Sequence, residues 1–390
     1  MRAGLILLCF AYVLSQFFRA FLAVLSGPLA RDVGATPDDL ATASGLMFVT
    51  FAAMQLPVGW ALDRIGPRRT ASALLLLGGG GGAALFAMAV SPLHINLSMV
   101  LIGAGCAPVL MSSYYIFARQ FSVARFATLA AVMLGVGSFG NLVASYPMAW
   151  AAETIGWRAA LWGLAAVSVA ASLGILALVR DPEAVAGDTR GSLLDLLRMP
   201  VVWAILPLMF VAYAPAAGLR GLWAGPYLRD IFGLDTVQVG QATLVMGMAM
   251  IAGTFAYGPL DRVFKSRKWV IFTGNVICAA ALMTLMLWPE RSLGLSIALL
   301  AVIGLAGSTY PVLIAHGRAF FPAHLAGRGV TLLNLFGIGG AGVAQFASGP
   351  LFASAATGGA VAGYKALFAL FTFALVIGLV IYLFSRDSME

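Results

Sequence analysis

The stretch that decides the fold is Gly59-Trp60-Ala61-Leu62-Asp63-Arg64-Ile65-Gly66-Pro67-Arg68-Arg69. It places a short charged loop between two apolar stretches, residues 40–62 and 70–90. Each stretch is long enough to cross a bilayer, because a spanning helix needs roughly 20 apolar residues. The sequence therefore predicts a helical hairpin that crosses a membrane twice.

The composition extends this prediction to the whole chain. Of the 390 residues, 61% are hydrophobic and only 10% are charged, whereas a soluble protein carries about 25% charged residues. Most of the surface must therefore face lipid. Twelve spans would use about 250 residues, which leaves short loops and no room for a sizeable soluble domain.

Hydropathy predicts an all-α integral membrane protein with twelve transmembrane helices. The expected spans are residues 5–28, 40–62, 70–90, 95–118, 126–150, 157–179, 201–228, 236–260, 269–288, 293–317, 328–352 and 362–384. The longest polar interruption separates two sets of six spans. The expected organisation is an N-terminal six-helix bundle at 1–180, a cytoplasmic linker at 181–200 and a C-terminal six-helix bundle at 201–390.

The net charge of +8 does not indicate a nucleic-acid partner, because the basic residues lie singly in short loops. They follow the positive-inside pattern when both termini are placed in the cytoplasm. Only Arg31, Arg158, Arg229, Arg291 and Lys365 then lie outside. The three cysteines lie within apolar stretches and imply no disulfide framework, and the first segment is expected to be a retained helix.

An internal repeat supports two related halves. Gly27-Pro28-Leu29-Ala30-Arg31-Asp32 ends the first span, and Gly225-Pro226-Tyr227-Leu228-Arg229-Asp230 ends the seventh, 198 residues later. The same offset carries Leu62-Asp63-Arg64 onto Leu260-Asp261-Arg262. Parallel repeats of this kind are expected of a transporter whose site lies at the repeat interface.

The segment Gly59–Arg69 resembles the signature loop between helices two and three of the major facilitator superfamily, and Gln55-Leu56-Pro57-Val58-Gly59 resembles many bacterial members. The resemblance covers essentially the whole chain. It implies a transporter of the bacterial inner membrane that works by alternating access, usually as a monomer, with a small-molecule substrate and no cofactor.

The signature loop also has a physical rationale. Asp63 lies at the C-terminal end of a helix, where the helix dipole disfavours a negative charge, so it needs a partner. The resemblance implies that Asp63 latches the bundles by facing the start of span eleven near Arg328, with Asp261 facing the start of span five. The gating residues implied are Gly59, Asp63, Arg64, Arg68, Asp261 and Arg262. The alternative is that these are solvated loop charges.

Two arginines lie inside apolar spans, whereas all 15 acidic residues fall in loops or near span ends. A charge at mid-membrane costs at least ~2.5 kcal/mol, so Arg19 and Arg220 are candidates for a functional site. Arg19 lies eight residues before Gly27, and Arg220 lies five residues before the repeat-related Gly225. The two positions differ by three residues, so the side chains project from similar helix faces roughly one turn apart. Helices one and seven line the cavity in the family that the sequence resembles. We therefore expect the pair to bind an anionic group; the alternative is that one of them, more readily the shallower Arg220, extends to the interface.

Other candidates are aromatic. Tyr114, Tyr310 and Trp223 are expected to wall the substrate cavity, although packing would explain aromatic residues in such helices as well. No catalytic or metal-ligating residues are expected. His94, His316 and His324 lie at or beyond span ends, so the sequence leaves facilitated diffusion, exchange and symport open.

Three functions compete. The first is a secondary or facilitative transporter of a small anionic metabolite. The second is an efflux carrier for an amphipathic or drug-like compound, disfavoured because Met99 and Ile102 stand where proton-coupled exporters carry arginine and glutamine. The third is a membrane-embedded receptor or enzyme. The sequence shows no cluster of His, Asp or Glu for an enzyme, and its loops are too short for a sensing domain.

Overall fold

The computed structural model describes residues 2–121, 123–182, 196–322 and 326–387. The side chains of residues 2, 123–128, 131, 261–262 and 326–328 lie outside that description, as does most of the predicted linker. Within the described residues, every regular element is helical, as predicted. The chain divides into unit 1, residues 1–187 with 236–240, and unit 2, residues 188–235 with 241–390.

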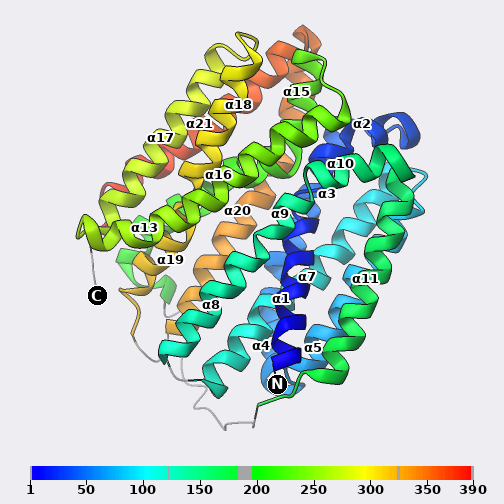
Figure 1. Cartoon of the computed structure of the whole chain (residues 1–390). Coiled ribbons are helices and arrows are strands. Elements are labelled where there is room, and N and C mark those ends of the chain that lie inside the picture. Colours follow the sequence, from blue (N-terminus) through cyan, green and yellow to red (C-terminus); the bar gives the residue numbers. More distant parts are fainter. Residues whose placement is uncertain (1, 122, 183–195, 323–325, 388–390) are drawn as a thin grey trace. The chain divides into compact units, whose positions relative to one another are not determined.

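Unit 1 contains the first six predicted spans (Figure 1). Its helices are α1 Arg2–Phe18, α2 Leu22–Val33, α3 Pro37–Ala53, α4 Gln55–Arg64, α5 Pro67–Leu74, the π-helix η1 Leu75–Gly81, α6 Gly82–Ala87, α7 Pro92–Gln120, α8 Val123–Gly137, α9 Phe139–Val143, α10 Tyr146–Ala151, the π-helix η2 Ala152–Gly156 and α11 Trp157–Leu178. α7 packs against α3, η1 and α1, and α1 also packs against α8, α9 and α11.

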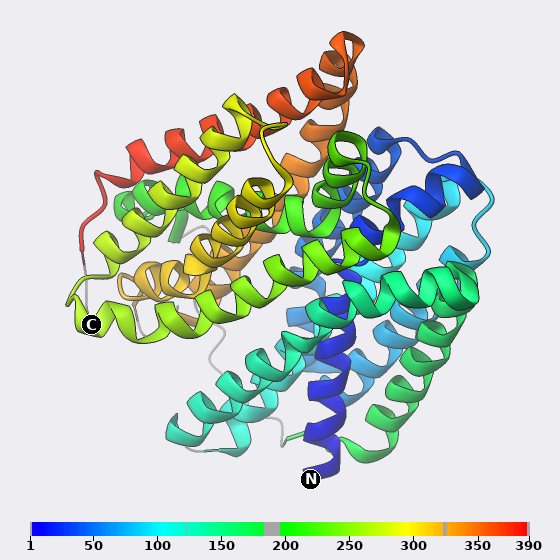
Figure 2. The ribbon, with the colours of Figure 1, turned by 45° about the horizontal axis from the view of Figure 1, so that its top comes forward.

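Unit 2 contains the remaining spans, except for the first residues of α16. Its helices are α13 Pro200–Ala212, α14 Ala214–Gly218, the π-helix η3 Leu219–Trp223, α15 Ala224–Phe232, α16 Thr236–Val263, α17 Arg267–Leu287, α18 Leu293–Ala306, the 3₁₀ turn η4 Gly307–Thr309, α19 Tyr310–Arg318, α20 Ala326–Ala355, the 3₁₀ turn η6 Ala356–Gly358 and α21 Ala360–Tyr382. α21 runs beside α17 (Figure 2) and also packs against α13 and α20.

The described helices account for twelve crossings. Ten helical stretches are long and apolar enough to span a membrane, and the bent pair α1 and α2 makes an eleventh. One of the ten, residues 132–178, has 47 residues. At 1.5 Å per residue it is about 70 Å long, twice the ~30 Å hydrocarbon core. The chain reverses within it at Gly156, whose φ is 83°, so this stretch crosses twice.

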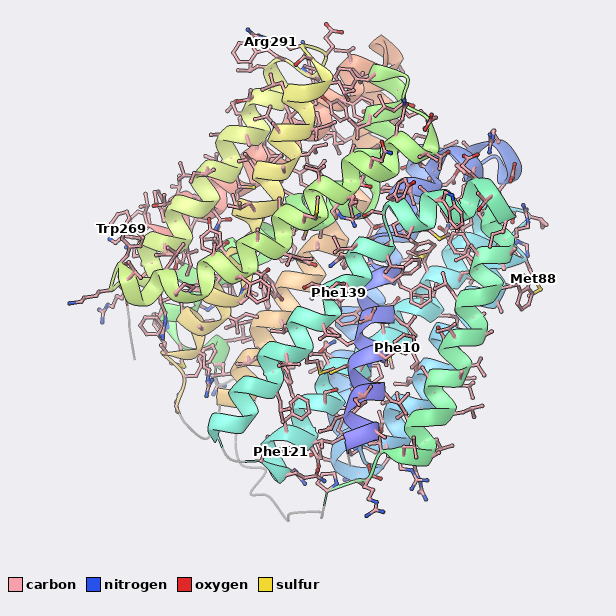
Figure 3. The ribbon with its side chains drawn as sticks, in the orientation of Figure 1. Phe10, Met88, Phe121, Phe139, Trp269 and Arg291 are labelled. Atoms are coloured by element: carbon pink, nitrogen blue, oxygen red, sulfur yellow. The ribbon has the colours of Figure 1, made fainter. Side chains whose placement is uncertain are left out.

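Apolar side chains on the unit surfaces fit a lipid environment. In unit 1, Phe10 is 41% exposed and Met88 53% exposed, and both are labelled in Figure 3. Large apolar side chains in such positions would be costly against water, since apolar surface gains free energy by leaving it. Contact with acyl chains removes that cost.

The sequence repeat produces repeated local structure. α2 ends at Gly34, with φ 70° and ψ 23°, and α15 ends at Gly233, with φ 70° and ψ 24°. Both glycines occupy the left-handed region, which favours glycine at a helix C-terminus. The first span of each half therefore ends by the same turn.

Close helix packing is also repeated. A Cβ atom added at Gly140 of α9 would lie 2.0 Å from the backbone oxygen of Val13 in α1. In unit 2, one added at Gly340 of α20 would lie 1.8 Å from the backbone oxygen of Phe210 in α13. In each unit, glycine lets the fifth span of that half lie directly on the backbone of the first span. This is the small-residue packing typical of membrane helices.

A carboxylate ties the first span of each half to the sixth. In unit 1, Trp157 Nε1 donates to Asp32 Oδ2 over 2.7 Å, and Arg158 Nη1 lies 3.6 Å from the same oxygen. In unit 2, the Tyr364 hydroxyl donates to Asp230 Oδ2 over 2.7 Å. Asp32 and Asp230 are the repeat-related residues that end the two quoted motifs.

We expect Tyr364→Phe to destabilise the protein by about 1.5 kcal/mol, the lower end of the range for a hydrogen bond to a charged group. Thermal unfolding of the detergent-solubilised protein measures this loss. Tyr257→Phe is the matched control, because the Tyr257 hydroxyl makes no hydrogen bond to the part of the chain that the structure describes. Equal stability of the two variants would contradict a role for the Asp230 bond.

A second carboxylate in each half binds the start of the third helix. The backbone N–H of Arg68 donates to Asp181 Oδ1 over 2.7 Å in unit 1. In unit 2, the backbone N–H of Lys268 donates to Asp387 Oδ1 over 3.0 Å, and the Ser266 hydroxyl donates to Asp387 Oδ2. Each carboxylate thus satisfies helix N–H groups that lack an intrahelical partner.

The hydrogen bonds to Asp387 predict that the stability of the protein depends on pH. Burial raises the pKa of Asp387, but hydrogen bonds from Ser266 and Lys268 outweigh it and hold the pKa below its ordinary value of 3.8. A depressed folded-state pKa stabilises the protein above the ordinary pKa, and this contribution disappears as pH falls through the folded-state value. We expect the difference in unfolding temperature between wild type and Asp387→Asn to shrink as pH is lowered below 3.8. A difference independent of pH would contradict this.

Candidate functional site

The first predicted span is broken at Arg19. The sequence predicts one continuous helix over 5–28, but α1 ends at Phe18, residues 19–21 form a turn, and α2 continues at an angle of 54°. The backbone N–H groups of Arg19 and Ala20 bond to carbonyls three residues earlier, over 3.3 and 3.0 Å. The turn is tightened relative to an α-helix. Arg19 therefore projects from an interruption inside a membrane span.

Arg19 is half-buried. Its Cζ atom lies 4.4 Å from the ring centroid of Phe51 in α3. A cation over an aromatic face gains about 0.5 to 2 kcal/mol, more when it is desolvated. Phe51 thus supports a positive charge inside the unit.

Arg220 lies in a second interruption. It belongs to η3, one π-helical turn within the seventh span, and only 2% of it is exposed. π-Helical turns in α-helices occur frequently at functional sites. The side chain is buried in the structure, which does not favour the alternative expectation that Arg220 extends to the interface. The sequence left both possibilities open, because the position of a residue along a span does not reveal which helices cover it.

Hydrogen bonds from α20 hold the Arg220 turn. Trp223 Nε1 donates to Ser348 Oγ over 2.9 Å, and Ser348 Oγ donates to the carbonyl of Gln345 over 2.7 Å. Gln345 Nε2 donates to the carbonyl of Gly218 over 3.4 Å. Trp223 itself is fully buried. Its contacts are those of a residue that fixes η3, and the role of a cavity wall remains a prediction.

The two tyrosine candidates, Tyr310 and Tyr114, have neighbours of their own. In unit 2, the Tyr310 hydroxyl donates to Asn334 Oδ1 over 2.7 Å, and the Tyr310 ring lies 5.0 Å from that of Tyr213. In unit 1, Tyr114 is half-buried on α7, with its ring 6.3 Å from that of Phe117. The Tyr310–Asn334 pair joins α19 to α20 and presents polar atoms within the helix bundle.

The signature loop makes contacts within unit 1. Asp63 Oδ1 lies 3.7 Å from Arg119 Nη2 at the end of α7, and Arg119 Cζ lies 4.0 Å from the Tyr115 ring centroid. Asp63 therefore has a partner on the fourth span, which the sequence did not suggest. The Asp63 side chain is 66% exposed, so this pair contributes roughly 0–1 kcal/mol.

The other loop residues have separate neighbours in unit 1. Arg68 Nε donates to the carbonyl of Leu176 over 2.5 Å, and Arg64 Cζ lies 5.3 Å from the Trp60 ring centroid. Gly59 has open space beside it, with the Met111 side chain 4.0 Å from an added Cβ. The side chains of Asp261, Arg262 and Arg328 lie outside the described residues. The latch role of the loop remains a prediction.

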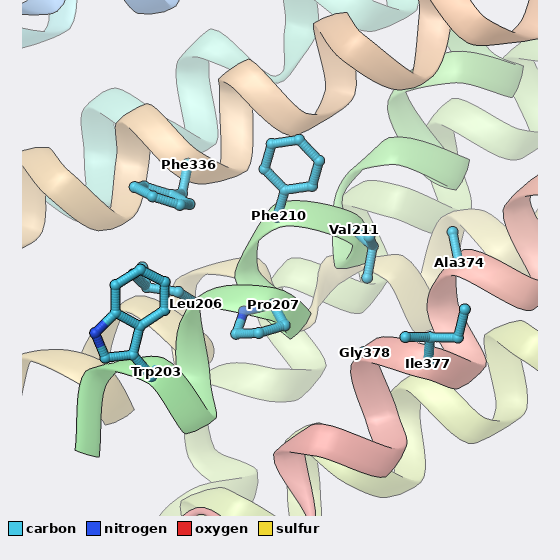
Figure 4. A pocket seen from close by; sticks show the side chains of 9 residues that line it. All are labelled: Trp203, Leu206, Pro207, Phe210, Val211, Phe336, Ala374, Ile377 and Gly378. Atoms are coloured by element: carbon cyan, nitrogen blue, oxygen red, sulfur yellow. The ribbon is translucent and has the colours of Figure 1, made fainter. Parts of the chain in front are cut away.

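Two cavities in unit 2 are apolar and contain neither arginine. One, of about 220 Å³, is lined by Trp203, Leu206, Pro207, Phe210, Val211, Phe336, Ala374, Ile377 and Gly378. Figure 4 shows these side chains, which come from α13, α20 and α21. The other, of about 360 Å³, lies along α17 and α21. Neither provides a polar group for a solute. Among the described residues, no group of three or more His, Cys, Asp or Glu could hold a metal ion.

The fold is that of known transporters. The structure matches that of a bacterial homologue of the human lysosomal transporter Spinster, inward-facing and occupied, with TM-score 0.75 and 18% identity over 98% of this chain and 94% of the other. It matches a D-xylose–proton symporter with TM-score 0.76 and 15% identity over 96% of each chain. At these identities the likeness concerns the fold alone.

The sequence gives the family assignment. No curated protein matches the chain. The family model described as Major Facilitator Superfamily matches residues 8–344, which includes the signature loop, both interrupted spans and most of both units. The chain therefore belongs to the Major Facilitator Superfamily.

Proposed function

We propose that this membrane transporter carries a small anionic solute and that Arg19 and Arg220 supply the positive charge for the solute's anionic group. Membership of the superfamily makes the chain a membrane transporter of small solutes, and we propose the bacterial inner membrane as its location. The proposal concerns the solute, which the family leaves open.

The observation that carries the proposal is the burial of Arg220 in a π-helical turn inside a membrane span. A guanidinium at this depth costs several kcal/mol. Such intramembrane charges mark ion and substrate pathways. Guanidinium binds carboxylate and phosphate groups through paired N–H donors in a fixed geometry, so an anion is the solute that this side chain recognises best.

Arg19 supports the same interpretation from unit 1. It also lies in an interruption of the first span of its half, and its guanidinium is positioned over Phe51. In both units, the half-helix that follows the arginine ends in a left-handed glycine and is fixed to the sixth span through Asp32 or Asp230. Each arginine therefore has a rigid support on one side.

Uptake into proteoliposomes tests the proposal. The purified transporter is reconstituted and given labelled carboxylates, phosphates and nitrate, with the uncharged amide of each carboxylate and D-xylose as neutral solutes. We expect saturable uptake of at least one anion, inhibited by other anions of similar shape and not by their neutral analogues. Saturable uptake of neutral or cationic solutes alone would contradict the proposal.

A further inference from the structure

The second cavity described above, of about 360 Å³, is a groove between α17 and α21 in unit 2, and it is apolar along its length. The described side chains that line it are Phe272, Val276, Ala279, Ala280, Met283, Thr372, Val376, Leu379, Val380 and Leu383. The one hydroxyl among them, on Thr372, donates to the carbonyl of Phe368 over 2.7 Å. The groove therefore offers no polar atom to a solute and suits a hydrocarbon chain.

The groove has the length of one leaflet. On α17 it extends from Phe272 to Met283, and on α21 from Thr372 to Leu383. Both intervals are eleven residues, or about 16 Å at 1.5 Å per residue. Half of the ~30 Å hydrocarbon core is about 15 Å. An acyl chain that enters from the loop end of the groove would thus reach the middle of the bilayer.

Basic residues surround the loop end of the groove. Lys265, Arg267 and Lys268 precede or begin α17, and Arg386 follows α21. Asp387 is the one acidic residue among the described residues of segments 263–268 and 383–387, which leaves a formal charge of +3 (4 − 1). Its two carboxylate oxygens accept from Ser266 and from the backbone of Lys268.

Lys268 connects this charge to the end of the groove. Its Nζ atom donates to the carbonyls of Leu383 and Ser385, both over 2.7 Å. Leu383 also lines the groove, and an ammonium group has three donors. The ammonium is thus held where an acyl chain would meet its headgroup. Trp269, 54% exposed, lies at this end of α17, and Figure 3 shows it at the opposite end from Arg291. Tryptophan at such a position is typical of the membrane interface.

We propose that this groove is a binding site for an anionic phospholipid of the leaflet that faces the basic loops. One acyl chain occupies the groove along α17 and α21, and the phosphate group lies at Lys268 and Arg386. Basic pockets at the ends of transmembrane helices recognise anionic headgroups in this way. The bound lipid holds the ninth and twelfth spans together on the surface of unit 2.

Native mass spectrometry of the full-length transporter in detergent tests the site. The protein is titrated with phosphatidylglycerol or with phosphatidylcholine of the same acyl chains, and bound lipids are counted. We expect the first phosphatidylglycerol to bind at least about fivefold more tightly than phosphatidylcholine, the factor that one basic residue contributes near a membrane surface. Inorganic phosphate should not compete, because it gains nothing from the groove.

Two variants, each with a control, distinguish the contribution of the apolar groove from that of the basic residues at its loop end. Val380, 52% exposed, lines the groove, and Val380→Trp fills it; Ile377, 61% exposed on the same helix, lines the other cavity, and Ile377→Trp is its control. Val380→Trp should weaken phosphatidylglycerol binding about tenfold, the effect of losing roughly 1.4 kcal/mol of apolar contact, and Ile377→Trp should not. Arg386→Gln should weaken phosphatidylglycerol alone, about fivefold, and Arg291→Gln should change neither lipid.

Three results would overturn the site. The first is equal binding of the two lipids by the wild type. The second is equal loss in Val380→Trp and Ile377→Trp. The third is equal loss in Arg386→Gln and Arg291→Gln, and this exposed pair decides the question if a tryptophan variant does not fold.

Discussion

Arg220→Ala is expected to lower the rate of anion uptake by about 30-fold or more while the protein still reaches the membrane folded. Truncating one partner of a buried charge pair costs at least about 2 kcal/mol, equivalent to this factor. Arg220 is 2% exposed, so water cannot replace the lost charge. Folding should survive, since the variant removes a charge that is costly to bury. Initial uptake rates in proteoliposomes, normalised to reconstituted protein, give the effect.

Arg19→Ala should act in the same direction with a smaller effect, because Arg19 is half-buried and solvent partly screens its charge. Arg→Lys at either position retains the charge but loses the paired planar donors, so it should restore part of the uptake. Arg31→Ala and Arg291→Ala, which remove exposed charges from unit 1 and unit 2, are the controls and should transport normally. Full uptake in both Arg19→Ala and Arg220→Ala would contradict an arginine-based anion site.

Gly340→Ala and Gly140→Ala are expected to prevent stable folding. The added Cβ would lie 1.8 Å from the Phe210 oxygen in unit 2 and 2.0 Å from the Val13 oxygen in unit 1, and neither backbone oxygen can rotate away as a side chain could. The helices must separate, and overpacking typically costs about 1–3 kcal/mol, with larger costs where, as here, backbone meets backbone. The yield of monodisperse protein and its unfolding temperature in detergent measure the loss.

Two other helical glycines provide matched controls. A Cβ added at Gly163 of α11 or at Gly258 of α16 meets no atom within 4 Å. Gly→Ala at these positions should be neutral or slightly stabilising, because alanine has the higher helix propensity. If all four variants behaved alike, the close contacts of α1 with α9 and of α13 with α20 would have no energetic importance.

The apolar runs predicted the helices well because the bilayer fixes their length and composition. The repeat offset of 198 residues identified Asp32 and Asp230 as related positions, and the structure gives each a donor from the sixth span of its half. The donors Trp157 and Tyr364 could not be predicted, because the offset does not reveal which helices are neighbours. The same limit applies to Arg119, the partner of Asp63.

The interruptions of the first and seventh spans could not be predicted from the sequence either. Arg19-Ala20-Phe21 contains neither glycine nor proline, the residues that normally signal a helix break, and its surroundings are uniformly apolar. The arginines themselves could be identified from composition, because charged residues are rare in membrane spans. Their exposure depends on tertiary packing, which the sequence does not contain.

The central claim is that the guanidinium groups recognise the charge of the solute. Its most direct test combines removal of charge from the protein with removal of charge from the solute. Equilibrium binding of the transported anion and of its uncharged isostere is measured for the wild type and for Arg220→Gln. We predict that the wild type prefers the anion by at least about 30-fold and that Arg220→Gln loses most of this preference. The same preference in both proteins would contradict the account.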